Sequence, residues 1–315
     1  MFVNTPDAIE GNRTEKCDTA SAAFQSENNG CVDYVGSEDE IMAEIRQLVC
    51  MLPGNNEGDV YTDTCEDDLN RACESMETMK GDPRYLLSEI SDGHVFFETK
   101  ADYAKNMVTG LIKLNGMTVG AVANCSEVYD AEGNKAETFD MSLTAQGCNK
   151  AAEFIQFCDA FSIPVLSITN VNGFKNCMCS EKKLAKALAR MTYAFSNATC
   201  AKVNMITGEA YGSAYVFMNS KSIGADLVYA WNDAKIGTMD STMAAKIMYP
   251  DADAAEIKEK ASEYEKLQSS ATSAAARGYV DRIIEPADSR KYLVAAFEML
   301  YTKYVGEPEK KHGTK

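Results

Sequence analysis

The chain has 315 residues, of which 45% are hydrophobic and 25% charged, a composition that excludes a disordered chain and allows a substantial buried core. Its formal net charge of -16 argues against nucleic acid and anionic membrane surfaces as partners, and no apolar run is long enough to insert in a bilayer. The N-terminus has no signal-peptide pattern and the eleven cysteines are scattered through predicted helices and strands, so we expect a cytoplasmic protein with reduced thiols.

The N-terminal part of the chain repeats a pattern found near its C-terminus. Residues 30–35 match residues 278–283, and the apolar positions that follow align without a gap at the i, i+3, i+4, i+7 spacing of a helix. Each copy therefore predicts a short strand and an amphipathic helix at the end of a domain, and two such endings imply two homologous domains in tandem. The alternative is chance similarity in a common pattern. The aligned apolar residues are Ile45, Leu48, Val49 and Leu52 in the first copy and Leu293, Ala296, Phe297 and Leu300 in the second.

Only the second ending has a full domain before it. The first is preceded by 29 residues, so the chain is expected to begin inside its first domain, with residues 1–53 as the C-terminal remnant of that domain. Residues 54–81 are rich in Gly, Asn and Asp and lack an apolar period, which predicts a linker. The second domain is then expected to occupy residues 82–315.

The second domain is predicted to be of the α/β class. Its first strands are expected at 95–98, 107–114 and 117–124, and the last two meet at Asn115-Gly116, a strong hairpin signal. From there, helices and apolar strands alternate, which indicates a sheet covered by helices. The predicted helices are 144–161 and 180–195, and the predicted strands are 163–169 and 202–206.

The last predicted strand leads into a turn of small residues, Tyr211-Gly212-Ser213-Ala214, followed by a buried helix. The first N–H groups of a helix have no intrahelical partners and carry the positive end of the peptide dipole, so they can hold an oxygen that becomes negative during a reaction. Small residues allow a ligand to approach that closely. The alternative is a turn that only lets the helix pack tightly on the sheet.

Four segments together resemble one family. FCDAFSIPVLSITNVNGF (157–174), AKVNMITGEAYGSAYVFMNSKSIGADLVYAW (201–231), GYVDRIIEPADSRKYLVAAFEML (278–300) and the closing KKHG (310–313) are similar to the carboxyltransferase subunit of biotin-dependent acyl-CoA carboxylases and decarboxylases. The resemblance implies a crotonase/ClpP-like α/β fold and two tandem crotonase-like domains per subunit, which the internal repeat indicates independently. Residues from 82 onward then correspond to the C-terminal, biotin-side carboxyltransferase domain.

The chemistry of that family requires no catalytic triad. The resemblance implies that a carboxyl group moves between the ureido nitrogen of biotin, carried on a protein, and the carbon beside the thioester carbonyl of a short-chain acyl-CoA. Both partners pass through oxyanion-like states that backbone N–H donors can stabilise. His94 and His312 are interpreted as structural, because neither has a convincing Ser or Cys partner. No metal site is predicted, since Cys177 and Cys179 form only a C-x-C without a second pair.

Carried over residue by residue, the resemblance places an oxyanion hole for the biotin ureido oxygen at Gly212, Ser213 and Ala214. The backbone N–H groups of Ser213 and Ala214 are the expected catalytic donors. Ser213 stands where the family commonly has a second glycine. This departure is tolerable if the backbone angle φ of Ser213 is negative and costly if it is positive.

Three further residues are expected to bind ligands. Val216 falls at the position that helps choose the acyl group in the family, and its apolar side chain argues for a short acyl chain; the alternative is a core residue of the helix. Gly173 and Phe174 resemble a loop near the biotin site, with Asn172 in place of the usual proline. Proline restricts the unfolded chain, so this loop is expected to be less rigid here.

The resemblance favours a carboxyltransferase subunit of the acetyl- or propionyl-CoA carboxylase type. One alternative is the corresponding subunit of a sodium-pumping methylmalonyl- or glutaconyl-CoA decarboxylase, and another is an inactive fragment that acts only in assembly. A third is a crotonase-type hydratase, which would need carboxylates beside the turn, where residues 208–216 offer Glu209. The choice of acyl-CoA, the direction of transfer and the activity of the chain alone stay open.

The implied partners follow from the same resemblance. They are a biotin carboxyl carrier protein or domain, biotin carboxylase or membrane decarboxylase subunits, and a second copy of the chain in a homo-oligomer. The thioester oxyanion hole of the family is a turn with paired glycines, and this chain contains no Gly-Gly pair. An N-terminal domain that supplies this hole is therefore an expected partner as well.

Overall fold

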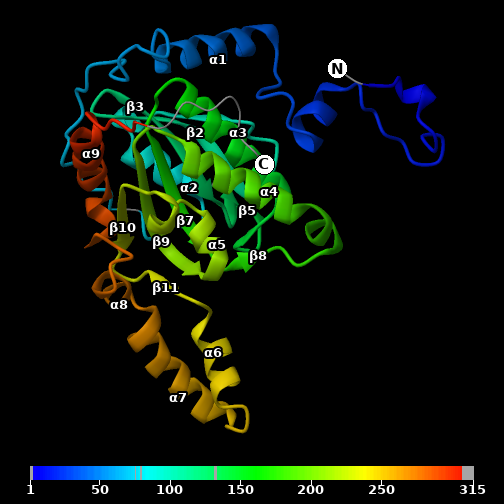
Figure 1. Cartoon of the computed structure of the whole chain (residues 1–315). Helices are drawn as coiled ribbons and strands as arrows, with labels where there is room; N and C mark the ends of the chain where they lie inside the picture. Colours follow the sequence, from blue (N-terminus) through cyan, green and yellow to red (C-terminus); the bar gives the residue numbers. More distant parts are fainter. Residues whose placement is uncertain (1–2, 75, 79, 131–132, 307–315) are drawn as a thin grey trace.

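The core of the described structure is a mixed eight-stranded sheet with the order β1-β2-β3-β7-β9-β10-β12 and with β11 paired to β9. The computed structural model describes residues 3–74, 76–78, 80–130 and 133–306 (Figure 1). Strands β1, β2 and β3 are antiparallel, and the strands from β3 to β12 are parallel. The strands are β1 (Phe96–Thr99), β2 (Met107–Leu114), β3 (Met117–Asn124), β7 (Val165–Val171), β9 (Lys202–Tyr211), β10 (Leu227–Trp231), β11 (Lys235–Gly237) and β12 (Arg282–Ile284).

The predicted hairpin between β2 and β3 is confirmed. Leu114 pairs with Met117, and the two turn residues, Asn115 and Gly116, have positive φ angles of 53° and 75°. This conformation matches the twist of the two strands, and asparagine and glycine are the residues that adopt it most readily. Gly116 has a further constraint, because a Cβ atom there would lie 2.2 Å from the backbone oxygen of Asp63.

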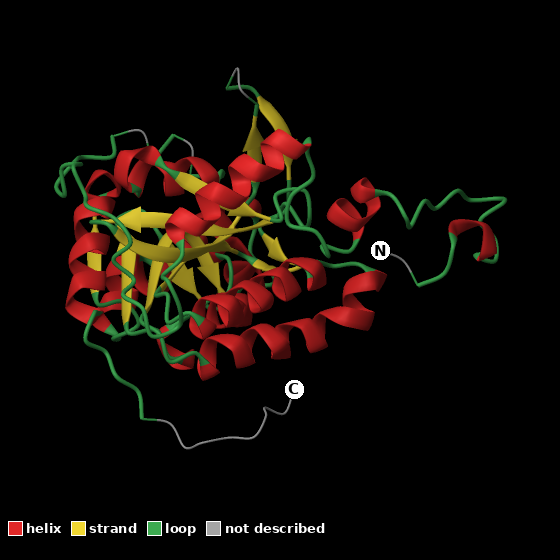
Figure 2. Cartoon of the chain, turned by 90° about the horizontal axis from the view of Figure 1, so that it is seen from above, coloured by secondary structure: helices red, strands yellow, loops and turns green. Residues whose placement is uncertain are grey.

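Helices cover both faces of the sheet (Figure 2). Helices α3 (Ala145–Ala160) and α4 (Met178–Asn197) share one hydrophobic cluster with the sheet, and α2 (Pro83–Ile90) and α9 (Ser289–Leu300) share another on the opposite face. The two helices and the strands predicted between residues 144 and 206 are thus confirmed. One face of α3 is buried because it packs on this sheet; its residues are Ala151, Phe154, Ile155 and Cys158.

The prediction of a strand at residues 30–35 was wrong, because this segment is an irregular loop. Its counterpart β12 pairs with β10, whereas no strand of the described structure lies beside residues 30–35, and an isolated strand has no hydrogen-bond partners. The helix that follows is present as α1 (Glu38–Met51), with a capping box between Ser37 and Glu40.

The apolar stripe of α1 is only partly covered. Ile45 is 49% exposed and Val49 is 64% exposed, while their counterparts in α9, Leu293 and Phe297, are fully buried. Leu48 and Leu52 are half-buried against the cluster that α3 and α4 share with the sheet. The sequence repeat therefore corresponds to two helices, α1 and α9, and the apolar stripe of α9 is more deeply buried than that of α1.

Residues 54–74, the strap, contain no helix or strand but pack closely on the hairpin of β2 and β3. The Thr118 N–H donates to the Val60 oxygen at 2.8 Å, and the Thr62 N–H donates to the Gly116 oxygen at 3.0 Å. Val60 and Cys73 are buried in the cluster of α2 and α9. A segment with the composition of a linker thus forms an ordered layer, because its polar backbone groups find partners in the domain.

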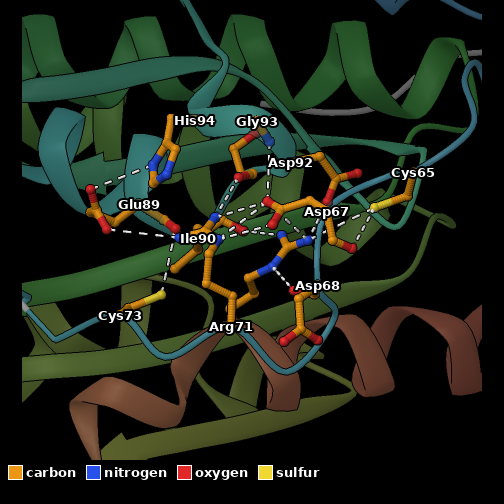
Figure 3. A network of polar contacts seen from close by, with 12 residues as sticks. Cys65, Asp67, Asp68, Arg71, Cys73, Glu89, Ile90, Asp92, Gly93 and His94 are labelled. Carbon is orange, nitrogen blue, oxygen red and sulfur yellow. Dashed lines mark hydrogen bonds and ion pairs between the residues drawn. The ribbon is translucent and has the colours of Figure 1, made fainter.

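A buried arginine on α9 anchors the strap through a polar network that includes Asp68, Ile90 and Asp92 (Figure 3). The Arg290 side chain is fully buried, and its Nη1 donates to the Ile90 oxygen at 2.6 Å. Its Nη2 donates to a carboxylate oxygen of Asp92 at 2.6 Å, and its Nε donates to the backbone oxygen of Asp68 at 3.1 Å. The guanidinium group therefore joins α9, the end of α2 and the strap in one network.

The remaining elements lie around this body. Helices α6 (Ser241–Met248) and α7 (Ala254–Tyr264) form a hairpin that projects from it, and α8 (Ala271–Ala276) leads back to β12 (Figure 1). Two small sheets pair β4 (Glu127–Tyr129) with β5 (Lys135–Thr138), and β6 (Ser142–Leu143) with β8 (Gly173–Phe174). Within the residues described, none of the helices has the length and apolar character needed to cross a membrane.

Candidate active site

Strand β9 ends in the small-residue turn predicted from the sequence. Gly212 follows Tyr211 with a φ of +58°, and a Cβ atom on this glycine would lie 3.1 Å from the Thr238 backbone oxygen. Ser213 is not among the residues with positive φ. The conformation that requires glycine therefore falls on Gly212, and serine at the next position carries no such strain.

The turn supplies backbone N–H donors at the start of a helix. It opens the short helix α5 (Gly212–Phe217), and the side chain of Tyr211 does not cap that helix. The first N–H groups of any helix have no intrahelical acceptor, so the donors of the turn are available to a ligand. Ser213 is exposed to solvent, whereas Ala214 is buried. Because α5 is so short, the individual N–H groups matter here more than a helix dipole.

Two cavities adjoin this turn, and Gly212, Ser213 and Thr238 line both of them. The first has a volume of about 510 Å³, and residues around it include Gly173, Phe174, Glu209, Tyr211, Ala214 and Met243. The second has a volume of about 560 Å³, and residues around it include Tyr215, Val216, Ile236, Tyr264, Arg277 and Tyr279. Cavities of this size accommodate small organic ligands. The turn can therefore contact two ligands at once.

The structure brings five of the six predicted site residues to the first cavity. Gly173 and Phe174 form β8, which pairs in parallel with β6, and the Phe174 ring lies 6.2 Å from the ring of Phe217 in α5. This contact places the loop after β7 against the turn. Val216 lies apart from that loop, in the second cavity, where it is half-buried beside a small cluster that includes Ile206.

Two tyrosines of the site were missed in the sequence. Burial raises the pKa of Tyr215 to about 12 and raises the pKa of Tyr211 above its usual range, with the nearby Glu209 carboxylate adding to the second shift. Both phenols are therefore neutral near pH 7 and can donate hydrogen bonds. The Tyr215 hydroxyl is buried and has no hydrogen-bond partner in the described part of the chain. Only their positions flanking the turn could have singled them out.

Carboxylates are present at the first cavity but are unequally available. Asp240 accepts hydrogen bonds from the N–H groups of Thr242 and Met243, so it caps α6. Glu209 lies on β9, and its own N–H donates to the Asn170 side chain at 3.0 Å. Glu209 is therefore the carboxylate of this cavity that could serve as an acid or base.

His94, Cys177 and Cys179, which are interpreted as non-catalytic, line neither cavity. His94 is half-exposed at the surface, with its Nδ1 3.5 Å from Glu89, and His312 lies outside the described residues. Cys177 and Cys179 are exposed at the start of α4. Among the described residues, no group of His, Cys, Asp or Glu is arranged to hold a metal ion.

Known proteins resemble the chain over its whole length. A family model described as "Carboxyl transferase domain" matches residues 1–314. The putative propionyl-CoA carboxylase beta chain of Bacillus subtilis is 37% identical over 327 residues, covering 99% of this chain and 62% of that protein. The methylmalonyl-CoA decarboxylase subunit alpha of Propionigenium modestum is 35% identical, with the same coverage. The chain thus spans about 62% of the length of these curated relatives.

A solved structure agrees with these relatives. The transcarboxylase 12S crystal structure, a hexamer with methylmalonyl-CoA and methylmalonic acid bound, matches 100% of this chain and 62% of that chain with a TM-score of 0.87 and 32% sequence identity. The similarity confirms the expected α/β, crotonase-like fold, including the mixed sheet and its covering helices. The chain therefore belongs to the carboxyl transferase family.

Proposed function

We propose that residues 82–306 form the biotin-side domain of an acyl-CoA carboxyltransferase, in which the N–H groups of Ser213 and Ala214 bind the ureido oxygen of biotin. The observation that carries this proposal is the uncapped turn between two cavities of about 510 and 560 Å³. Carboxyl transfer between two ligands needs one binding site for each, with hydrogen-bond donors where the two sites meet. The resemblance of 201–231 to the family supports the same assignment.

The residues of the site fit a ureido group. Its oxygen is a strong acceptor, and the two N–H groups of the turn are donors whose positions the backbone sets. When bound, biotin on its carrier protein supplies or receives the carboxyl group. As negative charge grows on the oxygen, the hydrogen bonds from Ser213 and Ala214 strengthen, and one such donor typically contributes about 3–4 kcal/mol to lowering the barrier. Because Tyr211 and Tyr215 are neutral, they place no second negative charge beside the one that develops on the ureido oxygen.

The second ligand is a short-chain acyl-CoA on this proposal. Val216 narrows the second cavity with an apolar side chain, which suits a small acyl group. The relatives named above are a propionyl-CoA carboxylase chain and a methylmalonyl-CoA decarboxylase subunit, so substrates of this size are expected for the family. The thioester oxyanion hole comes from a further crotonase-like domain, and the active assembly is a cytoplasmic oligomer that receives a biotin carrier protein.

A carboxyl-transfer assay tests this function. The chain is incubated with free biotin and malonyl-CoA or methylmalonyl-CoA, alone and together with the N-terminal half of a carboxyltransferase, and the transfer of label from the thioester to biotin is measured. We expect transfer only when both parts are present. The reverse reaction is followed with carboxybiotin and propionyl-CoA or acetyl-CoA.

The same assay separates the alternatives. Hydration of an enoyl-CoA by the chain, without carboxyl transfer in either direction, would contradict the proposal and favour Glu209 as the base of a hydratase. Absence of both activities, with the two parts bound to each other, would favour a role in assembly only.

A further inference from the structure

The short helix α5 is held at its C-terminal end by buried polar side chains from the sheet. Thr169 on β7 donates from its Oγ1 to the Oδ1 of Asn204 on β9 at 2.8 Å. Asn204 in turn donates from its Nδ2 to the backbone oxygen of Met218 at 3.2 Å. Thr169, Asn204 and Met218 are completely buried. Met218 is the residue that ends α5.

The direction of each hydrogen bond follows from the chemistry of the groups. Because the Asn204 oxygen accepts from Thr169, its NH₂ group must face the Met218 oxygen, which can only accept. The Thr169 Oγ1 lies 3.3 Å from the same Met218 oxygen, so both side chains converge on one carbonyl. The amide of Asn204 is therefore fixed in one orientation, and we call Thr169 and Asn204 the clamp.

A helix as short as α5 depends on such contacts. It has six residues, which is too few to be stable through its own hydrogen bonds. Its first residues provide the N–H groups of the candidate site, and the carbonyl that the clamp holds belongs to Met218, the residue directly after its last one. At 1.5 Å per residue, the two ends are about 9 Å apart. A shift of the Met218 end is thus transmitted to Ser213 and Ala214.

We propose that Thr169 and Asn204 are positioning residues for the donors of the turn. Neither residue lines either cavity. Both act through Met218, by holding α5 in the register that directs the Ser213 and Ala214 N–H groups at the ligand. This inference rests on the proposed function for its kinetic consequence, but its structural part concerns only α5. Displacements of about 1 Å at a catalytic group can reduce a rate by about 100-fold.

The test replaces Thr169 with valine, which has nearly the same volume and no hydroxyl. The matched control is Thr207→Val, because Thr207 is also fully buried, lies on β9, and has a hydroxyl with no partner in the described part of the chain. In the two-part transfer assay, Thr169→Val should lower kcat by about 10-fold to 100-fold and leave the KM for the acyl-CoA unchanged. Thr207→Val should keep kcat within about twofold of the original chain, and Thr169→Ser, which keeps the hydroxyl, should restore most of it.

A second readout does not depend on activity. Amide NMR spectra of the chain alone should show shifted signals for Ser213 and Ala214 in Thr169→Val but not in Thr207→Val. If the original chain transfers no carboxyl group in the two-part assay, the proposed function fails while these shifts still support the clamp. Unchanged Ser213 and Ala214 signals, or equal kcat losses in both valine variants, would overturn the inference. Asn204→Asp, which replaces the donor facing Met218 with an oxygen, serves the same test if Thr169→Val does not fold.

Discussion

Replacing Ala214 with proline should lower the rate of carboxyl transfer in the two-part assay by about 100-fold to 1000-fold. Proline has no N–H, so the variant removes one of the two donors of the turn. The position is within the first turn of α5, where proline breaks no intrahelical hydrogen bond. The loss should therefore appear mainly in kcat, while binding of the acyl-CoA is retained.

A glycine variant at the same position provides the control. Ala214→Gly alters the same buried side chain, by removing its methyl group, but it keeps the N–H. We expect it to retain most of the transfer activity, with a small loss of stability. Circular dichroism must show that the proline variant is folded. A folded Ala214→Pro chain that transfers as fast as Ala214→Gly would rule out the Ala214 donor.

Replacing Arg290 with methionine should have the largest effect on stability, lowering the free energy of unfolding by about 3–5 kcal/mol. Methionine fills much of the space of the arginine stem but donates no hydrogen bonds. The change removes the buried charged partner of the Asp92 carboxylate, which keeps hydrogen bonds from the N–H groups of Asn115 and Gly116. It also removes the arginine donors to the backbone oxygens of Ile90 and Asp68. A carboxylate that loses its opposite charge on folding is less well compensated for its desolvation.

Arg282→Met is the matched control, because it makes the same chemical change at an exposed site. The Arg282 guanidinium lies 4.6 Å from the centre of the Tyr292 ring, a contact worth about 0.5–1 kcal/mol at exposed sites. Urea unfolding followed by circular dichroism measures both variants. Equal midpoints for the two methionine variants would contradict the role assigned to the buried network.

Strands β2, β3, β7 and β9 and helices α3 and α4 could be predicted because their signals are local. Asn115-Gly116 specifies its own turn, and the spacing of Ala151, Phe154 and Ile155 specifies the buried face of α3. The segment at 30–35 carried the same local pattern as β12, yet it is a loop, because strand formation depends on a neighbouring strand that the local sequence does not contain. Composition predicts a linker at the strap because it is a local property. It carries no information on the strap's contacts with distant residues such as Arg290.

The candidate site divides in the same way. Gly212, Ser213 and Ala214 could be selected because a run of small residues between a strand and a helix is visible in the sequence. Tyr215 could not, because its burial and its unpaired hydroxyl depend on how α5 packs. Thr169 and Asn204 could not be connected either, since their contact arises from the parallel pairing of β7 with β9, which brings together two residues that are 35 positions apart.

The most direct test of the account is an NMR titration of the chain with biotin methyl ester, with the backbone amides assigned. If the turn binds the ureido oxygen, the amide protons of Ser213 and Ala214 should move downfield with a single binding curve, because each gains a hydrogen bond to a strong acceptor. The amide of Lys258, on the projecting helix α7, should not move. A saturable shift at other residues, with the Ser213 and Ala214 signals unchanged at saturation, would contradict the assignment of this turn as the site of the ureido oxygen.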